Sequence, residues 1–352
     1  MAKIKPVFSH FLEDRIRFLL PVIVVSVAKF AGTIAVANLP ESNYWSKLWG
    51  VDGWWLVFTG WDTEWYERIV RLWYPPSFDP HWAFFPLFPF SAKLVNFVVG
   101  NPHEALVIVS SFFGVAWIPL FQLVAERYMS RDDAFGCTLM TAFFPTVFLF
   151  TTVAYTESLF LFACLATWLY YLKGKMLYSA IFAAVATLTK TYGIAMIIPV
   201  ALGLLLERKW GKMMWLTIPF MALTSWALYF SISTGHVFLW EPIFYTVWPQ
   251  KPWSFEISNK GVFSVVFLPL LFYLAFQTRK VDRRLAAYTL ILSLVTLPNS
   301  SLWGWTRYLS FLFPAWLSFK SRNRVVLAAL ILVFYSGALW LWHSFSMGAW
   351  FS

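Results

Sequence analysis

Apolar runs separated by short polar or basic segments fill almost the whole chain. A run of about 20 apolar residues can cross a bilayer as one helix, and shorter runs cross only as broken helices buried in protein. The pattern predicts an all-α, multi-pass membrane protein with about eleven transmembrane helices in a single domain, residues 1–352. The predicted spans lie near residues 18–39, 104–124, 134–153, 158–172, 177–190, 192–206, 213–233, 261–277, 285–302, 307–319 and 325–345.

Residues 84–100 are apolar but fit this pattern poorly. The segment opens with two prolines and also contains Lys93 and Asn96. Proline interrupts helices, and a charge at membrane depth is costly. We expect the segment to be interfacial or re-entrant. The alternative, a true crossing, would move the next basic patch, at Arg127, to the outer side.

The first loop, residues 40–82, is long, aromatic and too polar to cross the membrane. Within it, Ile69 and Leu72 follow Trp65 and Tyr66 at helical spacing. This spacing predicts a short amphipathic helix that lies on the outer leaflet.

Basic residues orient the chain. The net charge is +10, and most of the 27 Lys and Arg residues lie in six patches beside apolar segments. Such flanking charge favours the cytoplasmic side, so it reports topology rather than a nucleic-acid-binding surface. The patches are Lys3/Lys5/Arg15/Arg17, Arg127/Arg131, Lys173/Lys175, Arg208/Lys209/Lys212, Arg279/Lys280/Arg283/Arg284 and Lys320/Arg322/Arg324.

Keeping all six patches on one side requires outward turns between them. Several spans that these turns join are shorter than a full crossing, so we expect an outward-facing cavity where they meet. The turns fall near residues 155–157, 190–193, 235–260 and 299–307.

The polar residues that remain gather on the outer side. Because ionisable groups beside a membrane are costly and tend to be functional, this asymmetry predicts a site there. The residues are Asp62, Glu64, Glu67, Arg68, His81, Glu157, Lys190, His236, Glu241 and Arg307.

Asp62 lies between Trp61 and Trp65 at the start of the predicted amphipathic helix. A partly desolvated carboxylate at such a position can serve as a general base. The structural alternative is a helix N-cap. Glu64 and Glu67 could also belong to the site, or they could be solvated charges on the face of the same helix.

Glu157 interrupts a run that is apolar on both sides, which indicates substrate or metal binding or, alternatively, a hydrated turn. Lys190 and Arg307 follow short apolar segments. Each could extend to lipid headgroups or bind the phosphate of a lipid-linked substrate, and Arg suits bidentate phosphate binding better. Lys29, inside the first span, could extend to the interface or form a pair, and no role follows from the sequence.

Several reaction classes lack support in the sequence. It contains no P-loop, no GxGxxG before a helix, no HExxH and no GxSxG. Cys137 and Cys164 lie in apolar runs, which favours neither a disulfide nor a cysteine metal site.

Four stretches of the chain resemble the PIG-V-like mannosyltransferases, integral membrane enzymes of the GT-C glycosyltransferase class. The resemblance covers roughly residues 55–195. Two positions depart from the family pattern: Lys190–Thr191–Tyr192–Gly193 stands where the family often has Arg-Ser-Asn-Gly, and Trp65 stands where His is common. The stretches are Trp61–Asp62 with Tyr66, residues 83–89 (AFFPLFP), Phe144–Pro145 leading to residues 155–160 (YTESLF), and Lys190–Gly193.

The resemblance implies a GT-C-type bundle that transfers mannose, with inversion, from a polyprenyl (dolichyl) phosphate donor to a glycolipid or glycan acceptor. The site would face the non-cytoplasmic side of a plasma membrane or of the endoplasmic reticulum. Asp62 would deprotonate the acceptor hydroxyl, while Lys190 and Arg307 stabilise the phosphate leaving group. Glu157 is a candidate ligand for Mg²⁺ or Mn²⁺, although a lone carboxylate gives weak support. The further residues expected to contact substrate are Glu64, Tyr66, Arg68, His81, Tyr155 and Glu157.

Two other classes of function stay open at this point. A transporter or flippase of lipid-linked sugars would place ionisable residues along a path through the bilayer and usually contains repeats. The acidic residues here stop at the outer boundary, and no repeat is evident. A non-catalytic membrane scaffold would fit if Asp62 only capped its helix.

Overall fold

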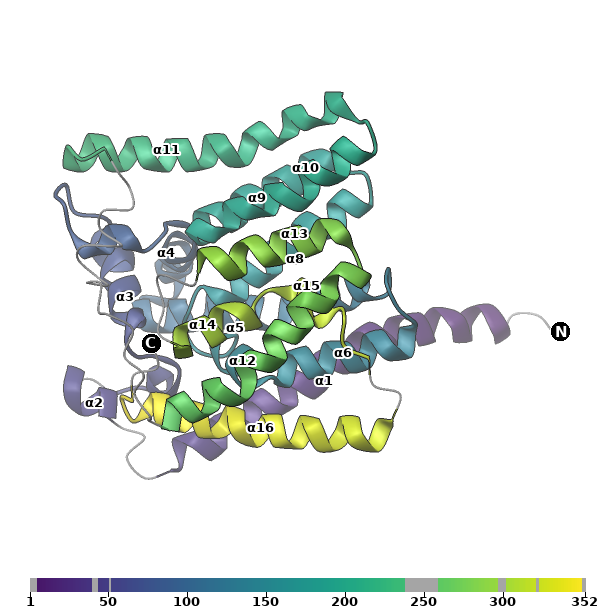
Figure 1. The fold of residues 1–352 in the computed structure, drawn as a ribbon. Helices are drawn as coiled ribbons and strands as arrows, with labels where there is room; N and C mark the ends of the chain where they lie inside the picture. The colour runs from purple at the N-terminus through teal and green to yellow at the C-terminus, as the bar shows by residue number, and fades with distance from the viewer. Residues whose placement is uncertain are drawn as a thin grey trace.

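The computed structural model describes residues 5–39, 44–50, 52–237, 259–296, 302–320 and 323–349, and these contain helices and no strand (Figure 1). The α-helices are α1 (Lys5–Ala37), α2 (Tyr44–Trp49), α3 (Asp62–Leu72), α4 (Leu87–Val99), α5 (Pro102–Ala125), α6 (Arg131–Phe143), α7 (Pro145–Phe150), α8 (Glu157–Leu172), α9 (Met176–Thr189), α10 (Ile197–Leu206), α11 (Thr217–Thr234), α12 (Asn259–Gln277), α13 (Arg283–Val295), α14 (Leu302–Ser310), α15 (Phe313–Trp316) and α16 (Arg324–Ser346). The 3₁₀ segments are η1 (Trp54–Phe58), η2 (Pro80–Ala83), η3 (Thr191–Met196), η4 (Trp210–Leu216) and η6 (Thr278–Lys280).

Long helices form a bundle in which α11 and α16 occupy opposite edges (Figure 1). From α16 the packing runs through α1, α5, α8 and α9 to α11. Among the described residues, four helical segments are long and apolar enough to cross a membrane: Arg17–Ala37, Pro102–Ala125, Trp210–Thr234 and Arg324–Ser346. They coincide with four predicted spans, so the chain is an integral membrane protein, and the count of eleven stays a prediction.

The core between these helices is aromatic. Five tryptophans are almost completely buried, at positions 82, 117, 168, 316 and 342. Many aromatic side chains therefore pack the protein interior, where large rings bury much apolar surface.

The loops that carry the basic patches contact one another. Arg17 pairs with Glu126 at 3.3 Å, and the Tyr128 hydroxyl donates to Asp282 at 3.1 Å. Arg284 lies 3.5 Å from Glu207, and Arg324 lies 3.5 Å from Asp132. These contacts bring loops that carry five of the six patches to one end of the bundle, here called the basic end, in agreement with the prediction that the patches share one side.

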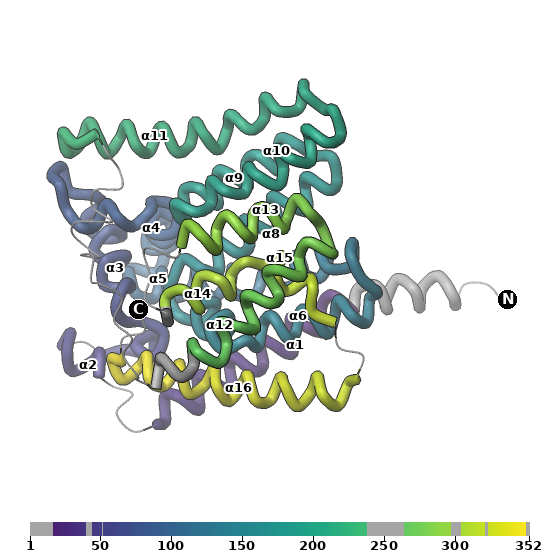
Figure 2. The backbone as a smooth tube through the Cα atoms, in the orientation of Figure 1, coloured from purple at the N-terminus to yellow at the C-terminus, as the bar shows by residue number. Residues whose placement is uncertain are grey.

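Helices α2 and α3 of the first loop lie at the end of the bundle opposite to the connection between α10 and α11 (Figure 2). There α3 forms at the predicted position. Ile69 and Tyr66 are buried, because α3 packs against α4 and α5, whereas Leu72 is 76% exposed. Part of the amphipathic pattern thus marks a protein interface, and the placement of the helix on the outer leaflet stays a prediction.

Helix α4 resolves the ambiguity over residues 84–100. Near its start Phe88 contacts Tyr66 of α3, and just beyond its end His103 stacks on Trp55 at 4.2 Å. Since both ends contact the same first loop, the segment returns to the side from which it came. This arrangement agrees with the re-entrant interpretation.

Prolines break two predicted spans. Residues 134–153 form α6 and α7, which are separated at Pro145. Residues 307–319 form the end of α14 and the short α15, which has Pro314 in its first turn. Proline lacks an N–H and clashes with the preceding turn, so neither segment continues as one helix. The predicted span at 307–319 is thus made of two short helical segments, in line with the broken helices expected for runs shorter than a full crossing.

Candidate active site

Asp62 is the first residue of α3. Trp61 before it has a φ of 52°, a left-handed conformation that is costly for a residue with a bulky side chain. The Tyr155 hydroxyl accepts the backbone N–H of Asp62 at 3.2 Å and lies 3.5 Å from the carbonyl oxygen of Gly60. Tyr155 thereby fixes the point at which the helix begins.

The carboxylate of Asp62 does not cap the helix. Instead the Thr63 hydroxyl accepts the N–H of Gly60 at 3.1 Å, and no side-chain cap hydrogen bond forms at this helix start. Within the part of the chain that the structure describes, the Asp62 carboxylate accepts no hydrogen bond, and it is half-buried. The N-cap alternative is therefore not supported.

The environment of Asp62 favours a protonated carboxyl more than water does. Burial raises the pKa of Asp62 to about 6 from 3.8, and Arg307 nearby opposes the shift while Glu157 adds to it. A pKa near neutrality suits a group that must take up a proton during turnover.

Glu157 is the centre of a buried ionic cluster, here called the Glu157 cluster, that also contains Lys190 and Arg307. Glu157 is only 1% exposed. Its Oε1 accepts from Lys190 Nζ at 2.7 Å and from Arg307 Nε at 2.7 Å, and Arg307 Nη2 also donates to this oxygen. Two cations meet one carboxylate, so the cluster has a net charge of about +1 at neutral pH.

Aromatic rings surround Arg307. Its guanidinium lies 4.0 Å from the ring centroid of Phe150 and 4.9 Å from that of Tyr155. Rings in these positions attract a cation through their negative faces. Since the hydroxyl of Tyr155 accepts from Asp62, the same ring connects the Glu157 cluster to the start of α3.

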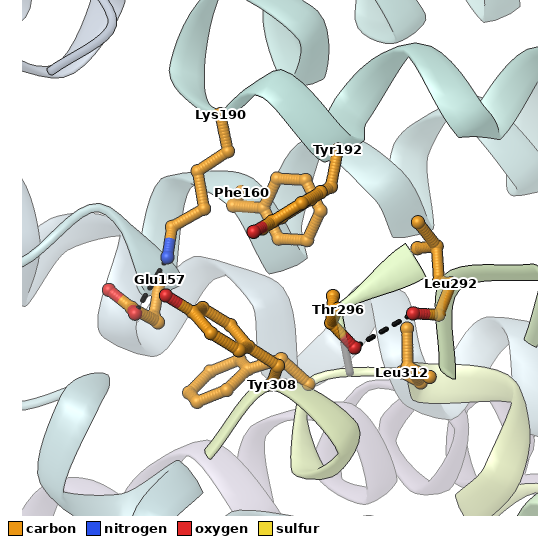
Figure 3. Close-up of a pocket in the computed structure, with 9 residues that line it drawn as sticks. Glu157, Phe160, Lys190, Tyr192, Leu292, Thr296, Tyr308 and Leu312 are labelled. Atoms are coloured by element: carbon orange, nitrogen blue, oxygen red, sulfur yellow. Dashed lines mark hydrogen bonds and ion pairs between the residues drawn. The ribbon is translucent and has the colours of Figure 1, made fainter. Parts of the chain in front are cut away.

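A pocket of about 340 Å³, including the part open to solvent, lies beside the cluster (Figure 3). Glu157, Lys190 and the rings of Tyr192 and Tyr308 form its polar part. Lys190 Nζ also lies 5.6 Å from the Tyr308 ring centroid. The remaining wall is mainly apolar and consists of Phe160, Leu292, Thr296, Phe311 and Leu312.

Six predicted site residues come together and three do not. Asp62, Tyr155, Glu157, Lys190 and Arg307 form the connected arrangement above, and buried Tyr66 contacts Tyr155 with ring centroids 6.4 Å apart. By contrast, Glu64 and Arg68 pair with each other at 2.6 Å on the exposed face of α3. His81 pairs with Asp79 and contacts Trp65. Glu241 lies outside the described residues.

Sequence analysis missed several residues of the pocket. Tyr308 follows Arg307 directly, and Tyr192 follows Lys190 by two positions, so adjacency to a cation was the available signal. Their rings meet edge to face with centroids 5.6 Å apart. Leu292 and Thr296 belong to a distant segment and carried no signal.

The donor set does not fit a divalent cation. The Glu157 Oε1 atom already accepts from two cationic side chains, and metal ions of this kind need several anionic or carbonyl oxygens. Among the described residues no three His, Cys, Asp or Glu side chains are grouped as metal ligands. A cation beside Glu157 would also meet the charges of Lys190 and Arg307.

No protein-family model and no curated protein sequence matches the chain. Its fold matches crystal structures of ArnT from Cupriavidus metallidurans. The apo structure superposes with a TM-score of 0.55 at 12% identity over 94% of this chain and 75% of ArnT. The structure bound to undecaprenyl phosphate gives a TM-score of 0.53 at 12% identity, over 94% and 76%. ArnT is a GT-C glycosyltransferase.

The chain shares the fold of these ArnT structures. At this identity the likeness concerns the fold, and it extends over nearly the whole chain. At the level of fold, it supports the GT-C class that the resemblance implies.

Proposed function

We propose that this protein is a membrane glycosyltransferase that transfers a sugar from a polyprenyl-phosphate donor to a hydroxyl acceptor. The observation that carries the proposal is the juxtaposition of the Asp62 carboxylate, which accepts no hydrogen bond from the described residues, with the Glu157 cluster and its largely apolar pocket. A lipid-linked donor needs all three of these features at a membrane boundary. The ArnT structure that binds undecaprenyl phosphate has the same fold, which supports this choice of lipid carrier.

The Glu157 cluster suits the phosphate of the donor. A sugar–phosphate–lipid diester carries one negative charge, which equals the excess positive charge of the cluster. Lys190 lines the pocket, whereas Arg307 is 8% exposed and directs two donors to Glu157. We assign the direct phosphate contact to Lys190. Arg307 stabilises charge from behind Glu157, which modifies the equal roles expected from the sequence.

Asp62 acts as general base in this proposal. The acceptor oxygen attacks the anomeric carbon of the sugar, the bond from that carbon to the phosphate oxygen breaks with its electron pair, and the acceptor proton goes to Asp62. The polyprenyl phosphate leaves with one additional negative charge. Lys190 and Arg307 stabilise this charge as it develops, which lowers the barrier more than it stabilises the bound donor.

The finer assignment rests on the resemblance to the PIG-V-like mannosyltransferases. On that basis the donor is dolichyl phosphate mannose, the acceptor is a glycolipid or glycan, and the reaction inverts the anomeric centre. The site then faces the non-cytoplasmic side, because the basic end lies at the opposite end of the bundle and positive charge favours the cytoplasm.

Reconstituted protein should be tested for transfer of radiolabelled sugar from a panel of donors. The panel contains mannose, glucose and a pentose, each on dolichyl and on undecaprenyl phosphate, and acceptors come from a lipid extract. We expect transfer from at least one donor, and mannose on dolichyl phosphate as the best. Movement of the donor across the bilayer without any sugar transfer contradicts the proposal and favours a flippase.

A matched pair of variants tests the phosphate contact. Lys190→Met should weaken binding of polyprenyl phosphate by about tenfold or more, because a charge-assisted hydrogen bond contributes about 1.5–3 kcal/mol. Arg68→Met removes a cation from the exposed face of α3 and should leave binding unchanged. Equal binding by both variants contradicts the role of Lys190.

A further inference from the structure

Lys29 lies near the middle of the apolar segment Arg17–Ala37, at a depth where a charged side chain is costly. Its Nζ donates to three oxygens: the backbone carbonyl of Thr151 at 2.6 Å, the backbone carbonyl of Gly114 at 3.0 Å and the Thr151 hydroxyl at 3.1 Å. An ammonium group has three N–H donors and no acceptor, so this set satisfies it completely. Among the described residues these partners are all uncharged.

The oxygens on Thr151 belong to an unusual segment. Residues 151–156 connect α7 to α8 without forming a helix, and every one of them is buried. Non-helical backbone at membrane depth persists only when other groups satisfy its polar atoms. The stability of this turn therefore depends on its partners.

Those partners come from several distant elements. Ser110 of α5 donates to the carbonyl of Val153 at 2.5 Å, and the N–H of Ala154 donates to Phe58 of η1 at 2.8 Å. The Thr63 hydroxyl of α3 donates to the carbonyl of Ala154 at 3.4 Å. Lys29 completes the set from α1, and its ammonium group connects Thr151, the first residue of the turn, to Gly114 of α5.

Gly114 makes this contact possible. A Cβ at this position would lie 2.0 Å from the carbonyl oxygen of Thr151 and 3.1 Å from Lys29 Nζ. Only glycine lets α5 approach closely enough for one ammonium group to reach both carbonyls.

We propose that Lys29 is a positioning residue for the active site, because it holds the turn that presents Tyr155 and Glu157 to Asp62. Tyr155 accepts from the N–H of Asp62, and Glu157 follows two residues later with both cations of its cluster. The distance from the general base to the phosphate-binding cations is thus set by residues 151–157. The expected effect of Lys29 on sugar transfer rests on the proposed function. The expected effect of Lys29 on the stability of the turn does not.

The test compares Lys29→Met with Tyr335→Phe. Methionine keeps a long side chain and removes the donors. The control removes a hydrogen bond of 2.8 Å from Tyr335 to the carbonyl of the neighbouring residue, Ala28, and does not touch the turn. Amide hydrogen exchange is followed in peptides covering residues 151–157 and α11.

Lys29→Met should accelerate exchange in residues 151–157 at least about fivefold while α11 stays unchanged, since only local partners are lost. Turnover should fall by about 10- to 100-fold, because catalytic groups displaced by about 1 Å lose rates of this order. The KM for the donor should change less than turnover. Tyr335→Phe should alter neither exchange nor turnover.

Exchange in the turn that matches the Tyr335→Phe control, or that rises equally in α11, overturns the proposal. If Lys29→Met does not fold, Ser110→Ala tests instead whether the turn depends on its side-chain donors, since it removes another donor to the same turn. That variant should show the same local pattern, and exchange that is unchanged in the turn contradicts the proposal. Exchange needs no substrate, so it decides the role of Lys29 even if the wild type transfers no sugar.

Discussion

Two ionic networks at opposite ends of the bundle differ in how completely their charges are compensated. At the basic end, Arg284 directs Nη2 and Nε to the two oxygens of Asp282, at 2.7 and 3.0 Å. Its Nη1 donates to the Tyr171 hydroxyl at 3.0 Å, and this hydroxyl donates to Glu207 at 2.7 Å. Lys209 Nζ pairs with the other oxygen of Glu207 at 2.6 Å, so two cations meet two carboxylates and each carboxylate oxygen has a donor.

The Glu157 cluster has the opposite arrangement. Lys190 and Arg307 share one oxygen of Glu157, and the other nearby carboxylate, Asp62, has no hydrogen bond among the described residues. A network that only stabilises a fold satisfies its members, as at the basic end. Incomplete compensation therefore distinguishes the network that can bind and react from the one that holds loops together.

The largest expected effect comes from Asp62→Asn. The amide cannot accept the acceptor proton, so turnover should fall by about 10²- to 10⁴-fold while the fold is retained. The measurement is sugar transfer at equal folded amounts of protein. Glu64→Gln is the matched control, because Glu64 lies two residues away on α3 and pairs with exposed Arg68. Near-normal turnover of Asp62→Asn would falsify the assignment of the base.

The second prediction compares the two networks directly. Glu157→Gln leaves Arg307 buried without a negative partner and should destabilise the protein by about 3–5 kcal/mol. It should also abolish transfer. Asp282→Asn at the basic end should lower stability by about 1–3 kcal/mol, because hydrogen bonds are lost, but it should keep turnover per folded molecule. Thermal unfolding in detergent and transfer assays measure both effects; equal losses of turnover would mean that the two networks have the same role.

The third prediction concerns pH. Asp62 has a pKa of about 6, so transfer should fall roughly tenfold for each pH unit below 6. The sign for stability is opposite. Because burial raises the pKa above 3.8, the ionised carboxylate destabilises the fold, and this cost decreases as the pH falls below 6 and is lost near the ordinary pKa of 3.8. Asp62→Asn should thus raise Tm above pH 6 and make no difference near pH 4. A Tm difference that grows as the pH falls would contradict this environment for Asp62.

Features that depend on residues close together in the sequence were predictable, and features that depend on tertiary contacts were not. The all-α membrane architecture, the four long spans and the shared side of the basic patches follow from hydropathy and charge, which act locally along the chain, whereas the GT-C class was expected only from the resemblance. Asp62, Glu157, Lys190 and Arg307 were found because charge is rare in apolar surroundings. Their chemistry as isolated groups was predictable, and their side of the membrane stays a prediction.

The sequence did not predict that two cations would share one oxygen of Glu157. Glu157 meets Lys190 and Arg307 across 33 and 150 residues of chain, and only tertiary packing sets that meeting. Lys29 gave no signal for the same reason, since its acceptors are backbone carbonyls that any sequence supplies. Glu64 and Arg68 were chosen by proximity to Asp62 along the chain, yet the helix directs them to the exposed face.

The smallest expected effect tests whether Tyr308 contributes to ligand binding through its ring or through its hydroxyl. The Tyr308 ring centroid lies 5.6 Å from Lys190 Nζ, and the ring contacts Tyr192 across the pocket. A cation above an aromatic face is stabilised by about 0.5–1 kcal/mol at a partly exposed site. Tyr308→Phe keeps the ring and should bind polyprenyl phosphate within about twofold of the wild type, whereas Tyr308→Leu should bind about two- to fivefold more weakly. Titration of each variant with polyprenyl phosphate measures the difference. If Phe and Leu weaken binding equally, the hydroxyl rather than the ring contacts the ligand, and Tyr308 belongs with Lys190 among the groups that bind phosphate.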